Sequence, residues 1–140
     1  MVKFDLDVVA LVSHIEELSR IYNSIKQAGL ADSLASAQAV TLFAPDNEAF
    51  AKLQGGTVMS ALEDSNKLKT ILTYHVVPQK FVASNLRKEK SVTTMQGGTL
   101  KIEEHRWLRS GIKVNGAVVK EADIEGTNGV IHVIDTVLMP

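Results

Sequence analysis

Four histidines are the side chains of this chain best suited to proton transfer or metal binding near neutral pH. They lie at His14, His75, His105 and His132, and no His-x-x-x-His or Glu-x-x-His pattern places two ligands on one helical turn. Cysteine is absent, which excludes disulfides, thiolate catalysis and cysteine metal sites. No Gly-x-Ser-x-Gly elbow or glycine-rich phosphate loop occurs. The sequence therefore predicts no catalytic residues, no metal site and no cofactor.

Trp107 is the single tryptophan and stands among acidic, basic and histidine residues between positions 103 and 109. An exposed tryptophan flanked by arginines is a plausible anchor for a protein partner or a sugar. The alternative is that it closes the end of a hairpin. Trp107 is therefore a candidate partner-binding residue.

The composition bounds the class of protein. The chain has 140 residues, of which 45% are hydrophobic and 5% aromatic, with a net charge of -1. Such a chain is long and apolar enough for one domain, here residues 1–140, with an aliphatic core. The near-zero charge argues against nucleic-acid binding. No apolar run approaches the ~20 residues that span a bilayer, and the first residues do not resemble a signal peptide.

Helical patterns dominate the first half. Ser13 followed by Glu16 fits a capping box, and apolar residues between positions 18 and 25 then recur with the period of one helical face. Gly29 stands where a helix would end in a left-handed cap. A buried strand is expected over residues 39–43, with Asp46 capping the helix that follows. Further helices are expected near residues 58–62 and 68–75.

Strand patterns dominate the second half. Apolar residues flank Gly97-Gly98 and Asn115-Gly116, and both pairs indicate hairpin turns. Residues 130–134 are apolar on both faces, which is typical of a central strand. Helices followed by antiparallel strands favour an α+β domain over a doubly wound sheet.

Three segments resemble the hallmark motifs of the fasciclin domain family. The first is Thr41-Leu42-Phe43-Ala44-Pro45-Asp46-Asn47-Glu48-Ala49-Phe50, and the second is the Tyr74-His75-Val76-Val77-Pro78 segment. The third is Asn128-Gly129-Val130-Ile131-His132-Val133-Ile134-Asp135. The resemblance extends from about residue 8 to residue 140. It implies a compact wedge of antiparallel or mixed β-strands packed against several helices, the helices lying mainly in the N-terminal half.

The resemblance also implies candidate contact residues. In animal members, a tyrosine-histidine segment and an Asp-Ile pair have been linked to integrin binding, and these positions correspond to Tyr74, His75, Asp123 and Ile124. The chain departs from that pattern at Ala122, and it contains no Arg-Gly-Asp tripeptide. The structural alternative is that His75 ends an apolar helical face and bonds to a neighbouring group, as His132 is expected to do within its strand. Asp123 and Ile124 could form a recognition point or an exposed acid beside a core residue.

We therefore predict an extracellular or cell-surface adhesion or protein-recognition module without catalysis. Its partners would be cell-surface or matrix proteins, or polysaccharide, and the resemblance implies secretion or display at the cell surface. A single-domain microbial member of the family fits the absence of cysteine. The alternative is a small-molecule or lipid binder with an apolar pocket between helices and sheet.

Overall fold

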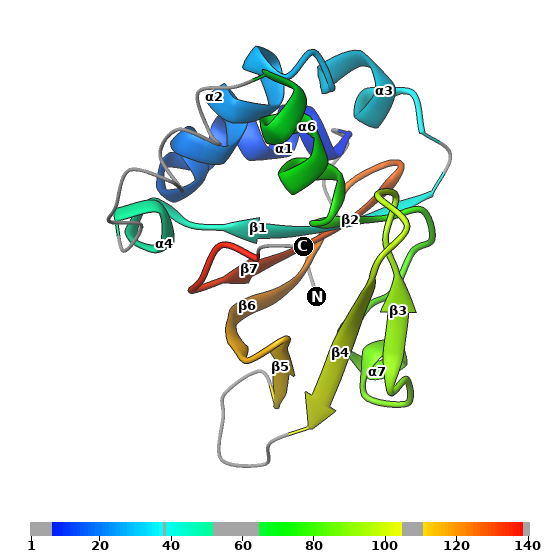
Figure 1. The fold of residues 1–140 in the computed structure, drawn as a ribbon. Helices are drawn as coiled ribbons and strands as arrows, with labels where there is room; N and C mark the ends of the chain where they lie inside the picture. Colours follow the sequence, from blue (N-terminus) through cyan, green and yellow to red (C-terminus); the bar gives the residue numbers. More distant parts are fainter. Residues whose placement is uncertain (1–6, 38, 52–64, 105–110, 139–140) are drawn as a thin grey trace.

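A computed structural model describes residues 7–37, 39–51, 65–104 and 111–138. Most helices lie in the first half of the chain, and most strands lie in the second half (Figure 1). The predicted helix near residues 58–62 and the position of Trp107 lie outside the described residues. In chain order the elements are α1 (Val8–His14), η1 (Glu16–Leu18), α2 (Ser19–Gln27), α3 (Ala31–Ala35), β1 (Val40–Pro45), α4 (Asn47–Ala51), α6 (Ser65–Thr73), β2 (Val76–Val77), α7 (Ala83–Leu86), β3 (Ser91–Thr93), β4 (Thr99–Glu104), β5 (Ile112–Val114), β6 (Ala117–Glu125) and β7 (Gly129–Ile134).

The caps of the first helices confirm one sequence prediction and correct another. Gly29 adopts φ 74 after α2, and the bonds from Gly29 N–H to Lys26 and from Leu30 N–H to Ile25 form the expected left-handed cap. The capping box at Ser13 was wrong. Helix α1 already contains Ser13, whose hydroxyl donates to the Ala10 carbonyl, and α2, the helix expected to follow the box, begins after Leu18 with no side-chain cap bond. Helix α1 itself is capped by Asp7. Asp7 offers an earlier side-chain oxygen, which accepts from Ala10 N–H at 2.9 Å.

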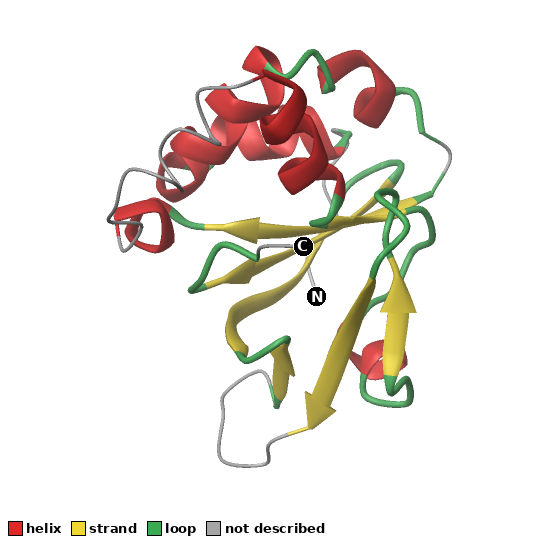
Figure 2. Cartoon of the chain, viewed as in Figure 1, coloured by secondary structure: helices red, strands yellow, loops and turns green. Residues whose placement is uncertain are grey.

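The described strands form one mixed sheet in the order β2-β1-β7-β6-β5-β4-β3 (Figure 2). Strands β1 and β7 are parallel neighbours, with Leu42 opposite Ile131 and Phe43 opposite His132. The other pairs are antiparallel. The two apolar segments that the sequence singled out, whose paired residues are 89 positions apart, therefore lie side by side at the centre of the sheet. This arrangement confirms the predicted α+β wedge.

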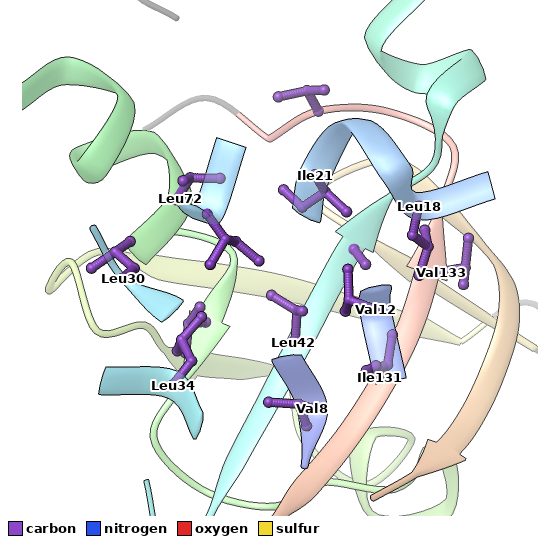
Figure 3. Packing of buried hydrophobic residues seen from close by; sticks show 14 of the residues in the cluster. Val8, Val12, Leu18, Ile21, Leu30, Leu34, Leu42, Leu72, Ile131 and Val133 are labelled. Atoms are coloured by element: carbon purple, nitrogen blue, oxygen red, sulfur yellow. The ribbon is translucent and has the colours of Figure 1, made fainter. Parts of the chain in front are cut away.

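Two clusters of buried side chains share these central strands. One face of β1 and β7, which includes Leu42, Ile131 and Val133, packs against α1, α2, α3 and α6 (Figure 3). The opposite face, which includes Phe43 and Ile134, packs against residues of β3 to β6. Because successive residues of a strand point to opposite faces, each central strand must carry mainly apolar residues on both faces. All six residues of β1 and of β7 are buried accordingly.

Asn128 and Gly129 join the helices to the sheet. The Asn128 carboxamide accepts from Val8 N–H at 3.0 Å and donates to the Leu34 and Ala37 carbonyls at 2.8 and 3.0 Å. Gly129 lies so close to β1 that an added Cβ would stand 2.1 Å from the Val40 carbonyl oxygen. The Asn128-Gly129 pair therefore fixes the helical layer to the sheet.

The sheet curls so that its two end strands, β3 and β2, approach each other. Beyond β3, the Met95 N–H donates to the Val76 carbonyl of β2 at 2.7 Å. In Figure 1 the turn between β3 and β4 accordingly lies beside β2. Among the described helices none is long and apolar enough to cross a bilayer.

Candidate recognition site

The Tyr74 side chain links two turns of the sheet. It is 7% exposed, and its hydroxyl donates to the Thr99 carbonyl and accepts from the Asn115 amide, each at 2.9 Å. Asn115 adopts φ 49 in the predicted hairpin turn, where Asn is tolerated in the left-handed region. Tyr74 therefore holds the β3–β4 and β5–β6 turns together.

His75 is buried, and both of its ring nitrogens are bonded to backbone. Nδ1 lies 2.8 Å from the Ile71 carbonyl, and Nε2 accepts from Leu138 N–H at 2.8 Å. Since the carbonyl requires a donor and the N–H an acceptor, the ring is the neutral Nδ1–H tautomer. Desolvation by burial lowers the pKa of His75 from 6.5 to about 4, although the bond to Ile71 opposes the shift. These contacts agree with the alternative that His75 bonds to neighbouring groups of the fold.

Asp123 lies at an irregularity of β6, where the register with β7 shifts between Glu121 and Ile124. Its φ is 62, an unusual value for a residue other than glycine. The carboxylate accepts from Ala83 N–H at 2.7 Å, and the Asp123 N–H donates to His132 Nδ1 at 3.2 Å. Ile124 is half-buried and packs against the helical cluster. Asp123 thus joins the sheet to the start of α7, whereas Ile124 contacts the helical layer.

His132 and Thr41 fasten the segment over residues 79–83. His132 is fully buried, stacks on Phe43 with ring centroids 5.7 Å apart, and bonds through Nε2 to the Phe81 carbonyl at 2.7 Å. Burial lowers its pKa, so this ring is also neutral. The buried Thr41 hydroxyl donates to Gln79 and accepts from Phe81 N–H. Apolar patterning of β1 gives no sign that Thr41 has this role, so sequence reasoning missed it.

A groove of about 300 Å³ lies between this fastened segment and the outer strand β3. It is lined by residues 77–79, 81, 89 and 91–93. Tyr74, held to the β3–β4 turn, supports one side, and Asp123, held to Ala83, supports the other. None of the sequence-predicted residues within the described ranges is itself part of this lining: Tyr74 and Asp123 bond to backbone at Thr99 and Ala83, and His75 bonds to Ile71 and Leu138. The groove depends on the curl of the sheet, which no local pattern indicates.

A second, larger cavity of about 590 Å³ has a mainly acidic lining, in which Lys120 is the one basic residue among those that the structure describes. The Lys120 ammonium bonds to Asp46 and lies 3.6 Å from Glu48, and the bond to Asp46 raises the pKa of Lys120. Asp46 also accepts from Ala49 N–H at 2.8 Å, as predicted for a helix cap. Across the described ranges, no three His, Asp or Glu side chains are grouped as a metal site would require. Neither cavity is the apolar pocket that the lipid-binding alternative requires.

Comparison with known proteins places this fold. A family model described as the fasciclin domain matches residues 16–140. The chain belongs to the fasciclin domain family. This finding confirms the resemblance carried by the three sequence motifs.

Fasciclin relatives occur in bacteria and animals. The chain is 40% identical over 139 residues to protein sll1483 of Synechocystis, covering 96% of this chain and 74% of that protein. It is 37% identical over 122 residues to transforming growth factor-beta-induced protein ig-h3 of Sus scrofa, covering 87% of this chain and 17% of that protein. Among solved structures, a fasciclin domain pair from the insect cell adhesion molecule fasciclin I superimposes with a TM-score of 0.76 at 24% identity, covering 96% of this chain and 51% of that one. The last comparison establishes the shared fold.

Proposed function

We propose that this fasciclin domain is an adhesion or protein-recognition module that performs no chemistry of its own. The observation that supports it most is family membership, together with the fold shared with an insect cell adhesion molecule. The ring nitrogens of His75 and of His132 are all bonded to backbone groups, so in this arrangement neither ring offers a nitrogen for proton transfer. This supports a role in binding. A rigid domain can then recognise a partner through its surface alone.

The proposed contact region comprises the segments that carry Tyr74, His75, Asp123 and Ile124, with Trp107 as a further anchor outside the described residues. Because the Tyr74 and His75 side chains are buried, their part in this proposal is to hold backbone in place: Tyr74 holds the β3–β4 and β5–β6 turns, and His75 holds Leu138. Asp123, half-buried, fixes the backbone next to Ala83. The partners proposed are cell-surface or matrix proteins, or polysaccharide.

The test is binding of the folded domain to immobilised matrix proteins, polysaccharides and intact cells at physiological salt. Saturable binding is expected, and it should vanish when the domain is first unfolded by heat. An unrelated domain of similar size and charge controls for non-specific attachment. If the domain, folded by circular dichroism, binds none of these surfaces, the proposal is wrong.

Secretion or display at the cell surface is part of the same proposal, supported by the fold shared with a cell adhesion molecule. Fractionation of the producing organism, followed by detection with an antibody against this domain, tests it. The protein is expected in the medium or on intact cells, where added protease can reach it. Recovery only after lysis would contradict this part of the proposal.

A further inference from the structure

The outer edge of β3 presents backbone groups that no described strand pairs with. Ile102 N–H donates to Lys90, and Thr94 N–H donates to the Gly98 carbonyl, so even-numbered residues of this strand face β4. In an antiparallel pair the alternate residues then direct their N–H and C=O groups away. Ser91 and Thr93 are those residues, and β3 is the last described strand of the sheet.

The opposing edge of the groove runs along β2, where alternate residues also direct their backbone N–H and C=O groups outward. Phe43 N–H donates to the His75 carbonyl, so residues 75 and 77 face β1 and residue 76 faces away. The Val76 carbonyl accordingly accepts from Met95 N–H at 2.7 Å, which joins the two edges at one point. Pro78 comes next on the outward side and has no N–H to donate. The edges are thus joined at Met95, and the groove lies between them from there to Glu89.

The alternation of exposed and buried residues along β3 suits a site for one extended chain. Val92 is 5% exposed and forms part of the floor, whereas Ser91 and Thr93 are exposed. A strand placed beside β3 would therefore direct every second side chain toward this floor and the others to solvent. Both sides are walled, so a single chain fits between them more readily than the sheet edge of a second folded domain.

The walls are fixed before any partner arrives. Thr41, His132 and Asp123 bond to backbone groups at residues 79, 81 and 83 on one side, and Tyr74 bonds to Thr99 on the other. A site held in this way loses little conformational freedom on binding. Among the described residues of the lining, Glu89 is the only charged one, and its neighbours Lys88 and Lys90 are not part of the lining.

We propose that this groove binds an extended segment of a partner protein, which adds a strand to β3 through backbone hydrogen bonds at Ser91 and Thr93. The segment would alternate apolar and polar residues and carry a lysine or arginine near Glu89. Strand addition to an exposed edge gives affinity from the main chain and specificity from alternate side-chain pockets. This inference rests on the proposed recognition function and identifies the surface and the chemistry of the partner.

The test uses a soluble peptide, acetyl-Lys-Val-Thr-Val-Thr-Lys-amide, titrated into the isotopically labelled full chain and followed by NMR. Amide shifts are expected at residues 91–93 and at the facing segment 77–81. The same peptide with alternate backbone nitrogens methylated should lose binding at least tenfold, since it can no longer donate along one edge. Shifts confined to other surfaces, or equal binding by the methylated peptide, would overturn the proposal.

Two variants test the edge itself. Thr93→Pro removes an outward N–H that β4 does not use, so the peptide should bind at least tenfold more weakly while the sheet remains folded. Thr93→Val keeps the N–H and adds no charge, so a loss in Thr93→Pro that is absent in Thr93→Val assigns the effect to the backbone donor. Should Thr93→Pro fail to fold, Glu89→Lys is used in its place. Glu89→Lys should bind the basic peptide more weakly, whereas Glu17→Lys, the same charge change at the other cavity, should leave its affinity unchanged. Equal binding by wild type, Thr93→Pro and Glu89→Lys would overturn the proposal.

Further outcomes separate this inference from the recognition function. Concentration-dependent dimers with shifts at residues 91–93 in the absence of peptide would assign the groove to a second copy and overturn the proposal. Adhesion of folded Thr93→Pro at the wild-type level would contradict the groove and leave the recognition function standing. Absence of adhesion by the wild type, with peptide binding intact, would contradict the recognition function instead.

Discussion

The imidazole of His75 accepts a hydrogen bond from the backbone N–H of Leu138 at 2.8 Å, although 63 positions separate the two residues. The end of α6 is thereby attached to the segment that follows β7. Leu138 itself belongs to the core cluster inside the curled sheet, beside Tyr74 and Ile134. A neutral histidine thus joins the segment that carries Tyr74 to the segment that carries Leu138, and both residues belong to the core cluster inside the curled sheet.

This contact makes the stability of the domain depend on pH. The pKa of His75 is about 4 in the folded state and 6.5 when the ring is solvated, so between these values only the unfolded chain binds the proton. The stabilisation is complete above pH 6.5 and is lost as pH falls toward 4. At pH 5 we expect the free energy of unfolding to be about 2 kcal/mol lower than at pH 7.5 from this group alone.

Urea titrations at both pH values measure this loss. His132, whose pKa is also lowered, adds to it with the same sign. In His75→Gln the loss between pH 7.5 and 5 should shrink by about 2 kcal/mol, because this group no longer titrates. His14→Gln, at an exposed position in α1, tests whether removal of any histidine has the same effect. An unchanged pH dependence in His75→Gln would contradict the role assigned to this ring.

Tyr74→Phe should destabilise the domain by about 1–2 kcal/mol. The substitution removes a hydroxyl with two partners and leaves the Asn115 amide and the Thr99 carbonyl each without one bond. Urea unfolding measures the cost, with Tyr22→Phe as control, since Tyr22 packs beside Lys26 on α2. A loss of adhesion in Tyr74→Phe at a temperature where it stays folded would show that the turns it holds matter for binding. A cost equal to that of Tyr22→Phe would contradict the prediction.

Substitutions of Asp123 separate its side-chain bond from its backbone conformation. Asp123→Asn keeps an oxygen for Ala83 N–H and tolerates φ 62, so its cost should stay below about 1 kcal/mol. Asp123→Ala loses the acceptor and is strained at this φ, and we expect about 2–3 kcal/mol. Asp123→Gly loses only the bond and should fall between them. Thermal unfolding of the three variants gives this order, and an alanine variant as stable as the asparagine variant would contradict it.

Features that depend on neighbouring residues were accessible from the sequence. The Asn115-Gly116 turn, the cap at Gly29 and the cap at Asp46 each follow from local backbone chemistry. The buried central strand at residues 130–134 follows from apolar residues on both faces. Local sequence patterns do not predict which group each buried polar side chain will bond to. Thr41 and Asn128 are isolated polar residues in sequence, and their roles arise from backbone that the fold brings to them.

The candidate site shows the same division. Motif resemblance pointed to Tyr74, His75 and Asp123, and the structure shows all three bonded to backbone: Tyr74 to Thr99, His75 to Leu138 and Asp123 to Ala83. The groove itself depends on the bond between Met95 and Val76, which forms only when the sheet has curled. Periodicity predicts strands and turns, but the curl is a property of the whole sheet.

Gly129→Ala should be among the most damaging single substitutions in the sheet. Its new Cβ would meet the Val40 carbonyl at 2.1 Å, and the obstacle is backbone in the parallel neighbour rather than a flexible side chain. We expect a loss of at least about 3 kcal/mol or failure to fold. Gly116→Ala is the matched control: open space surrounds it, and only its φ of 83 is unfavourable, so the cost should be about 1 kcal/mol. Similar costs at both positions, by urea unfolding, would contradict the close approach of β1 and β7.

We propose that residues 1–140 unfold as one domain, because both core clusters are built on β1 and β7. Leu18→Ala truncates the helical cluster, and Leu100→Ala truncates the cluster inside the curled sheet. Each should cost about 2–5 kcal/mol. Since neither cluster can lose its central strands alone, each variant should lower the unfolding midpoint equally for helical circular dichroism and for exchange of β4 amides. Two separate transitions, with one cluster melting while the other persists, would show instead that the domain is divided along its central strands.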